Sequence, residues 1–145
     1  MKIETKYHGL IEVQEEKVIR FPNGLPGFLE EKEFAVIPFS DDGTFFILQS
    51  VQTPELGFVM TNPFTFYPDY DFNLENQSVE ALELDSAEDV SVYSILTMAD
   101  QFHLTTANLQ APVVVNMKRK LGKQVILKGS PYQTKHYLFP EAIVK

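Results

Sequence analysis

Most hydrophobic positions of this 145-residue chain alternate with polar positions, in short runs rich in β-branched and aromatic residues. Such runs are typical of β-strands that turn one face toward a core. Glycine, proline, asparagine and aspartate separate the runs at intervals of about 8–12 residues, which indicates an antiparallel barrel or sandwich. The expected strands are 17–21, 34–39, 45–50, 57–61, 90–98, 105–109, 112–118 and 123–128.

Helical patterning is confined to one segment. Leu74, Val79 and Leu82 lie near helical spacing, and Glu75 falls in the first turn that they define, where a carboxylate is favourable. We therefore expect one short helix between positions 73 and 84. The segment 132–145 is amphipathic and is expected to dock on the body or to form an arm. No repeat, linker or low-complexity stretch divides the chain, so we expect a single domain over 1–145.

Charge is distributed very unevenly. The formal net charge is −8, and residues 33–117 carry 13 acidic side chains but neither lysine nor arginine. A surface of one sign repels nucleic acid and anionic membranes and attracts basic partners, although solubility alone is an alternative explanation. The absence of a signal sequence and of an apolar run near ~20 residues favours a cytoplasmic protein. We expect a basic protein partner, with no direct nucleic-acid or membrane binding.

Few patterns indicate catalysis, a cofactor or a metal. The chain has no cysteine, its three histidines are far apart, and it has no nucleophile elbow or phosphate-binding loop. Asp69, Asp71, Asn73 and Glu80 have the spacing of a calcium loop, but Leu74 occupies the position that needs glycine. A solvated acidic loop is the favoured interpretation. We expect no enzymatic activity, cofactor or small-molecule substrate, and a ligand- or calcium-binding barrel module is the alternative function.

The segment 64–73 is the strongest candidate for a partner-binding surface. It holds five aromatic residues within positions 64–72, with prolines and acidic residues beside them. An exposed aromatic patch next to carboxylates is typical of protein-binding sites, whereas core packing is the alternative for the same rings. The residues selected as contacts for a basic partner are Asp69, Tyr70, Asp71, Asn73 and Glu75.

Three other aromatic residues are further candidates. Phe28 follows a turn cluster with two prolines and two glycines, and it is either an aromatic anchor for a partner or a core plug under that loop. Tyr137 and Phe139 belong to the amphipathic C-terminal segment and form a second candidate surface. Asn108 and Asn116 flank a strand-like run, and their side chains are expected to satisfy turn backbone groups rather than a partner.

Several motifs together give the chain a family resemblance. They are FPNGLPGF at 21–28, LQS at 48–50 with Pro54, Pro63 with Tyr70, NLQAPVVVN at 108–116 and GKQVIL at 122–127. The first and fourth motifs are specific, and the set runs nearly from end to end. On these residues the chain resembles the flagellar assembly factor family known as FliW.

The resemblance implies a fold, partners and a regulatory role. Members of this family are small, cytoplasmic, antiparallel β-barrel-like proteins without enzymatic activity. They bind flagellin before export, and they also bind CsrA, a dimeric RNA-binding repressor that blocks flagellin translation. Flagellin that accumulates occupies the assembly factor and frees CsrA, so translation stops. Between an acidic mimic of RNA and an antagonist that binds beside the RNA site, the resemblance favours the allosteric antagonist.

Overall fold

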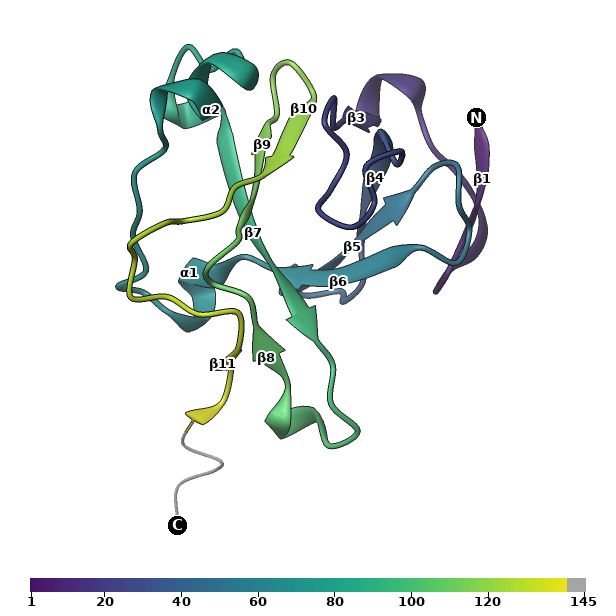
Figure 1. Cartoon of the computed structure of the whole chain (residues 1–145). Helices are drawn as coiled ribbons and strands as arrows, with labels where there is room; N and C mark the ends of the chain where they lie inside the picture. The colour runs from purple at the N-terminus through teal and green to yellow at the C-terminus, as the bar shows by residue number, and fades with distance from the viewer. Residues whose placement is uncertain (141–145) are drawn as a thin grey trace.

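Seven strands close into a barrel in the computed structural model, which describes residues 1–140 (Figure 1). Neighbouring strands follow the order β7-β6-β5-β4-β3-β10-β9, and β9 pairs back onto β7 to close the ring. All of these pairs are antiparallel except β10 with β3, which run parallel through Leu121 and Arg20. The barrel strands are β3 (Ile19–Arg20), β4 (Glu33–Pro38), β5 (Phe45–Ser50), β6 (Gly57–Thr61), β7 (Val90–Thr97), β9 (Val113–Asn116) and β10 (Leu121–Gln124).

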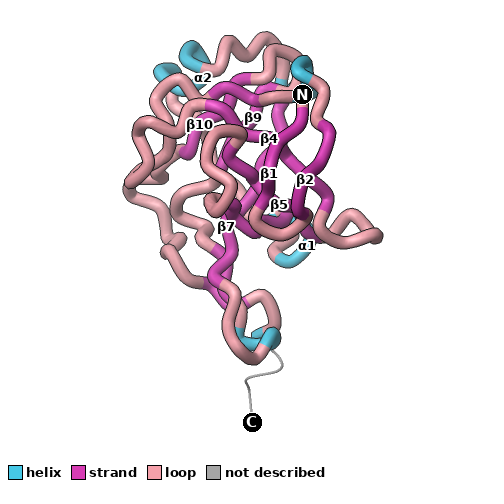
Figure 2. The backbone as a smooth tube through the Cα atoms, turned by 90° about the vertical axis from the view of Figure 1, so that its right-hand side faces the viewer, coloured by secondary structure: helices cyan, strands magenta, loops and turns pink. Residues whose placement is uncertain are grey.

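The remaining elements decorate this barrel. Strands β8 (Thr106–Ala107) and β11 (His136–Tyr137) extend the sheet beyond β7, while β1 (Lys2–Thr5) and β2 (Gly9–Glu12) form a separate hairpin. Figure 2 faces this hairpin, which is joined to β5 by a 3.0 Å hydrogen bond from the Lys6 amide to Gln49 Oε1. The helices are α1 (Pro63–Phe66) and α2 (Asn76–Ala81), and the three-residue 3₁₀ turns are Glu15–Lys17, Ala87–Asp89 and Phe102–Leu104.

Alternating side chains fill the barrel interior. Phe21 and Phe34 are fully buried and pack edge to face, with ring centroids 5.2 Å apart. Gly122 on β10 lies directly against Phe21, and a Cβ atom at this position would come within 2.4 Å of the ring. Only glycine fits there without displacing the ring. The other members of this core cluster are Ile19, Leu25, Leu48, Met60, Val113 and Val115.

The mainly β, barrel-like architecture expected from the sequence is confirmed. Strands β5 and β6 begin and end where the alternating pattern indicates, whereas β10 begins two residues earlier than expected and β3 contains only two residues. The β1–β2 hairpin and helix α1 were not anticipated, and α2 is shorter than the segment 73–84. No helix within residues 1–140 has the length and apolar character needed to cross a membrane. Residues 141–145 of the amphipathic C-terminal segment lie outside the described part of the chain.

Candidate partner-binding surface

A groove of about 590 Å³ lies between α1, α2 and the first half of β7. Most of its walls are apolar, and among residues 1–140 the charged side chains that line it are two aspartates. We call it the acidic groove because further exposed carboxylates, those of Glu75, Glu83 and Glu88, belong to the same stretch of chain. It is lined by Phe64, Asp71, Phe72, Asn73, Leu74, Val79, Leu84, Asp85, Ser86, Ala87, Val90 and Val92.

Helix α1 positions one aromatic residue at the rim of the groove. Asn62 caps this helix by accepting a 2.9 Å hydrogen bond from the Phe64 amide, and Pro63 occupies the first helical position, where its missing N–H costs nothing. The Phe64 side chain is 41% exposed. Of the five aromatic residues in 64–72, Phe64 is exposed, Tyr70 is buried and the other three are half-buried, so the patch is partly surface and partly core.

Tyr70 is buried beneath the aromatic residues of the groove. Its side chain is only 4% exposed, and its hydroxyl donates a 2.7 Å hydrogen bond to the Leu109 carbonyl. Its ring packs against those of Phe64, Phe72 and Tyr132, with centroids 4.6–5.7 Å away. Burial, with a smaller effect of Tyr132, raises the pKa of the Tyr70 hydroxyl. The Tyr70 ring is therefore inaccessible in this structure, and partner contact by this residue stays a prediction.

The other four residues selected from this stretch are exposed, but they do not all face one site. Asp71 and Asn73 line the acidic groove. Glu75 begins α2 and lines an adjoining hollow together with Asp71 and Asn73. Asp69 lies on the other side, near Tyr67. Among residues 1–140, no group of three or more acidic or histidine side chains is placed to hold a metal ion.

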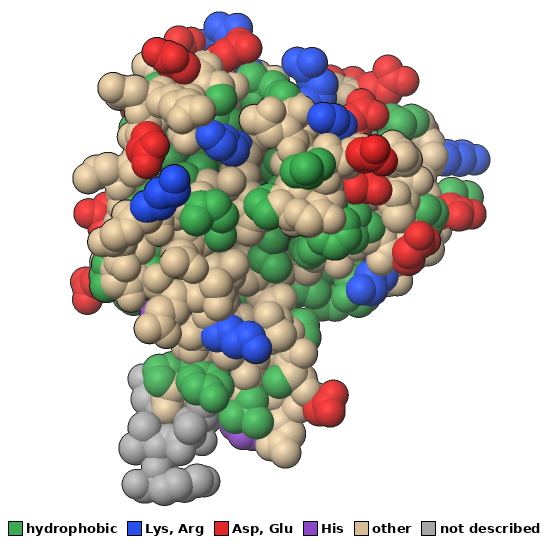
Figure 3. Space-filling view, viewed as in Figure 1, with side chains coloured by type: hydrophobic (Ala, Val, Ile, Leu, Met, Phe, Trp, Pro, Cys, Tyr) green, Lys and Arg blue, Asp and Glu red, His purple; other side chains and the backbone are tan. Residues whose placement is uncertain are grey.

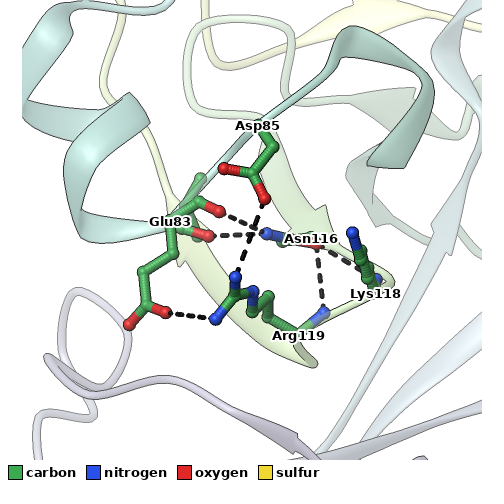
Figure 4. Close-up of polar contacts among 6 residues, drawn as sticks. Glu83, Asp85, Asn116, Lys118 and Arg119 are labelled. Carbon is green, nitrogen blue, oxygen red and sulfur yellow. Dashed lines mark hydrogen bonds and ion pairs between the residues drawn. The ribbon is translucent and has the colours of Figure 1, made fainter.

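A buried asparagine fixes the far wall of the groove (Figure 4). The Asn116 side chain donates to the Leu82 and Glu83 carbonyls at 2.7 and 3.2 Å, where the chain leaves α2. Its Oδ1 accepts from the Lys118 and Arg119 amides at 3.0 and 3.1 Å. This one amide thus joins the end of α2 to the β9–β10 turn. Glu83 is held at φ 52°, a conformation unusual for a residue other than glycine.

Arg119 partly offsets the negative charge on this side. Its guanidinium lies 3.3 Å from a Glu83 carboxylate oxygen and 3.7 Å from one of Asp85 (Figure 4). All three side chains are about half exposed or more, so each pair contributes at most ~1 kcal/mol. Asp71, on the opposite wall, and Glu75, in the adjoining hollow, have no salt bridge within residues 1–140. Their negative charge is therefore not offset by a salt bridge in the part of the chain that the structure describes.

The three aromatic candidates outside this stretch lie elsewhere. Phe28 is 41% exposed and packs edge-on against Phe58, so it is not buried under its loop. The buried side chains beneath that loop are those of Phe21 and Leu25. Tyr137 is 47% exposed on β11, whereas Phe139 is half-buried against other aromatic rings. Partner contact by any of these three residues stays a prediction.

Asn108 and Asn116 have the structural role expected of them. Asn108 Oδ1 accepts from the Gln110 and Ala111 amides at 3.1 and 3.0 Å, and Asn116 bonds as described above. No sequence pattern indicates the connection between Asn116 and the end of α2, because the bonded residues are more than thirty positions away.

Comparison with known proteins agrees with this architecture. The family model for the FliW protein matches residues 2–138. A flagellar assembly factor FliW from Geobacillus thermodenitrificans is 54% identical over the whole length of both chains, and one from Bacillus subtilis is 48% identical over 94% of this chain and 95% of its own. A crystal structure of the flagellar assembly factor FliW superposes with a TM-score of 0.93 at 52% identity, covering 97% of this chain and 98% of the other. The chain therefore belongs to the FliW family of flagellar assembly factors.

Proposed function

We propose that this chain is a non-enzymatic, cytoplasmic partner switch. It binds flagellin, and when it is free of flagellin it binds the repressor CsrA and antagonises repression of flagellin mRNA. Family membership supports the role in flagellar assembly and does not favour the ligand- or calcium-binding alternative. The observation that carries the CsrA part is the acidic groove, which combines apolar walls with lining carboxylates and no lysine or arginine.

The chemistry of CsrA explains why such a groove suits it. A protein that holds RNA phosphates must be basic at its RNA site, and an acidic partner is steered toward it. The apolar walls and exposed Phe64 supply the non-polar contact that charge alone does not. We expect one assembly factor bound per CsrA protomer, with an affinity that falls as salt screens the carboxylates.

Antagonism by this surface is proposed to be allosteric. An acidic protein bound beside the RNA site disfavours RNA through repulsion or a change of shape, without occupying the site. Such coupling is reciprocal, so bound RNA weakens the binding of the assembly factor by the same factor. A direct mimic of RNA would instead compete without limit.

The test is a titration of this protein against CsrA, repeated with flagellin present and with CsrA preloaded with leader RNA. The proposal expects tight binding that flagellin abolishes. Displacement of RNA that saturates, with a detectable ternary complex, supports allostery, whereas displacement without limit supports mimicry. Failure to bind CsrA at all would contradict the switch.

Matched variants test whether the acidic groove is the CsrA surface. Asp71→Asn removes an exposed carboxylate that lines the groove, and Glu75→Gln removes one that lines the adjoining hollow. CsrA affinity should fall, with a weaker salt dependence. The control pair is Glu55→Gln and Asp100→Asn, two exposed acids on the β5–β6 and β7–β8 connections. Equal losses in the two pairs would mean that only net charge matters and that the groove has no special role.

A further inference from the structure

A second groove, chemically unlike the first, lies over one end of the barrel. It has a volume of about 360 Å³ and brings the FPNGLPGF and NLQAPVVVN motifs together. Leu25, Phe58 and Ile95 form part of it and also pack on the interior cluster of the barrel. None of its eleven lining residues is charged. We call it the neutral groove.

The apolar wall of the neutral groove stands on a rigid loop. Pro26 and Gly27 form a tight turn in which the Leu25 and Phe28 backbones bond in both directions, at 3.2 and 2.7 Å, with Gly27 at φ 85°. Gly24 also has a positive φ, and a Cβ there would lie 2.5 Å from the Leu29 carbonyl oxygen. A loop fixed in this way loses little conformational entropy when a partner binds.

Side chains tie the same loop to the rest of the barrel. The Glu31 carboxylate accepts hydrogen bonds from the Ser50 and Thr53 hydroxyls at 2.5 and 2.6 Å, and Lys32 Nζ donates to the Pro22 carbonyl at 2.9 Å. Despite this order, two large apolar side chains of the loop remain in solvent. Phe28 is 41% exposed, and Leu29 next to it is 65% exposed.

Apolar side chains gather on the surface around this loop. Ile126, which lines the groove opposite the loop, is 48% exposed. Figure 3 shows hydrophobic side chains in the region of the Phe21–Lys32 loop, with charged side chains around them. Exposed apolar side chains held rigidly beside a hollow are typical of a surface that a partner covers.

Carboxamides supply the polar groups of the groove. The acceptor Oδ1 of Asn108 is used within the loop, which leaves its Nδ2 as a donor. Gln124 Nε2 donates to the Ala111 carbonyl at 3.0 Å, which leaves Oε1 as an acceptor. The Gln110 carboxamide makes no hydrogen bond within residues 1–140, so it offers both. These neutral donors and acceptors can form hydrogen bonds with peptide groups or carboxamide side chains of a partner, and they supply no charge to pair with a charged side chain.

We infer that the neutral groove binds an uncharged amphipathic segment with apolar and carboxamide side chains, supplied by flagellin and not by CsrA. This inference rests on the proposed function. A groove without carboxylates offers no electrostatic attraction to a basic RNA-binding protein. An uncharged segment in the acidic groove would bury the carboxylates of that groove without a charged partner. The two partners therefore bind separate surfaces. They exclude one another either through a steric clash between the bound partners or through an allosteric effect transmitted by the barrel.

The experiment uses the full chain and measures affinity for flagellin and for CsrA in turn. Phe28→Ser and Ile126→Ser remove two exposed apolar contacts, and Leu10→Ser, at a residue 63% exposed on the β1–β2 hairpin, is the matched control. We expect the groove variants to weaken flagellin binding by about tenfold or more and CsrA binding by less than about twofold. Flagellin binding should also change little with salt, in contrast to CsrA binding.

Two results would overturn the inference. Flagellin that binds the Phe28→Ser and Ile126→Ser variants as tightly as it binds the unchanged protein would show that the groove is not its site. CsrA affinity that falls as much as flagellin affinity would show that the groove is not selective. Failure of the proposed function appears differently, because the unchanged protein itself would then bind neither partner. Thermal unfolding of each variant checks that the fold is intact.

Discussion

The Asn116 side chain makes four hydrogen bonds, and Asn116→Ala removes all of them. Loss of the bond to Leu82 leaves a buried carbonyl without a donor, which costs ~1–3 kcal/mol of folding free energy. Loss of each of the three part-buried bonds costs a further ~0.5–1 kcal/mol. We therefore expect the free energy of unfolding to fall by about 2.5–6 kcal/mol. Since a domain of this kind has about 5–15 kcal/mol in total, the change is large.

Asn108→Ala is the matched control for this prediction. Asn108 uses only its acceptor, for two part-buried backbone amides, so its loss should cost about 1–2 kcal/mol. Guanidinium unfolding of both variants gives the comparison directly. If Asn116→Ala costs no more than Asn108→Ala, the two bonds donated to the end of α2 contribute nothing, and the argument that they hold the wall of the acidic groove is wrong.

Three further predictions concern stability. Glu31→Ala should lower the free energy of unfolding by about 2–3 kcal/mol, because two hydroxyls lose a charged acceptor; circular dichroism would check this against unchanged protein. Gly122→Ala should cost about 3 kcal/mol or more through its contact with Phe21, and a cycle with Phe21→Leu should recover part of the loss. Burial lowers the pKa of His136, whose Nε2 accepts from the Gln133 amide, so the folded state takes up a proton less readily than the unfolded one. Stability should therefore fall as pH drops below the ordinary histidine value of ~6.5, and His136→Asn should flatten that slope in unfolding measured between about pH 8 and pH 5.

The sequence allowed the barrel strands to be predicted where alternation and turn residues agree. Strand β5 has polar turn residues before it and a glutamine and serine at its end, and its bounds were predicted without error. The β1–β2 hairpin was missed because each strand has only four residues and the β2 sequence, GLIE, shows no alternation. Strand β10 begins earlier than predicted because Gly122 was assigned to the turn before the strand. In the structure this glycine belongs to the strand, where the Phe21 ring leaves no room for a side chain.

The candidate sites were less predictable for a different reason. Acidic and aromatic residues close in the sequence indicated the stretch 69–75, but burial separates Tyr70 from its neighbours, and burial depends on contacts with Leu109 and Tyr132. The neutral groove combines residues from positions 25–28 with others from 108–126, and no local pattern joins them. For Phe28, now exposed beside this groove, the sequence favoured core packing.

The parallel pairing of β3 with β10 affects when this protein becomes able to act. Residues 19–20 and 121–124 come from opposite ends of the chain, and the ring also needs β9 on β7. Contacts between such distant segments form late, and a ribosome must have released most of the chain before they form. A nascent or truncated chain that lacks β9 or β10 accordingly has neither the closed barrel nor the neutral groove. Any binding at that groove therefore requires the completed barrel.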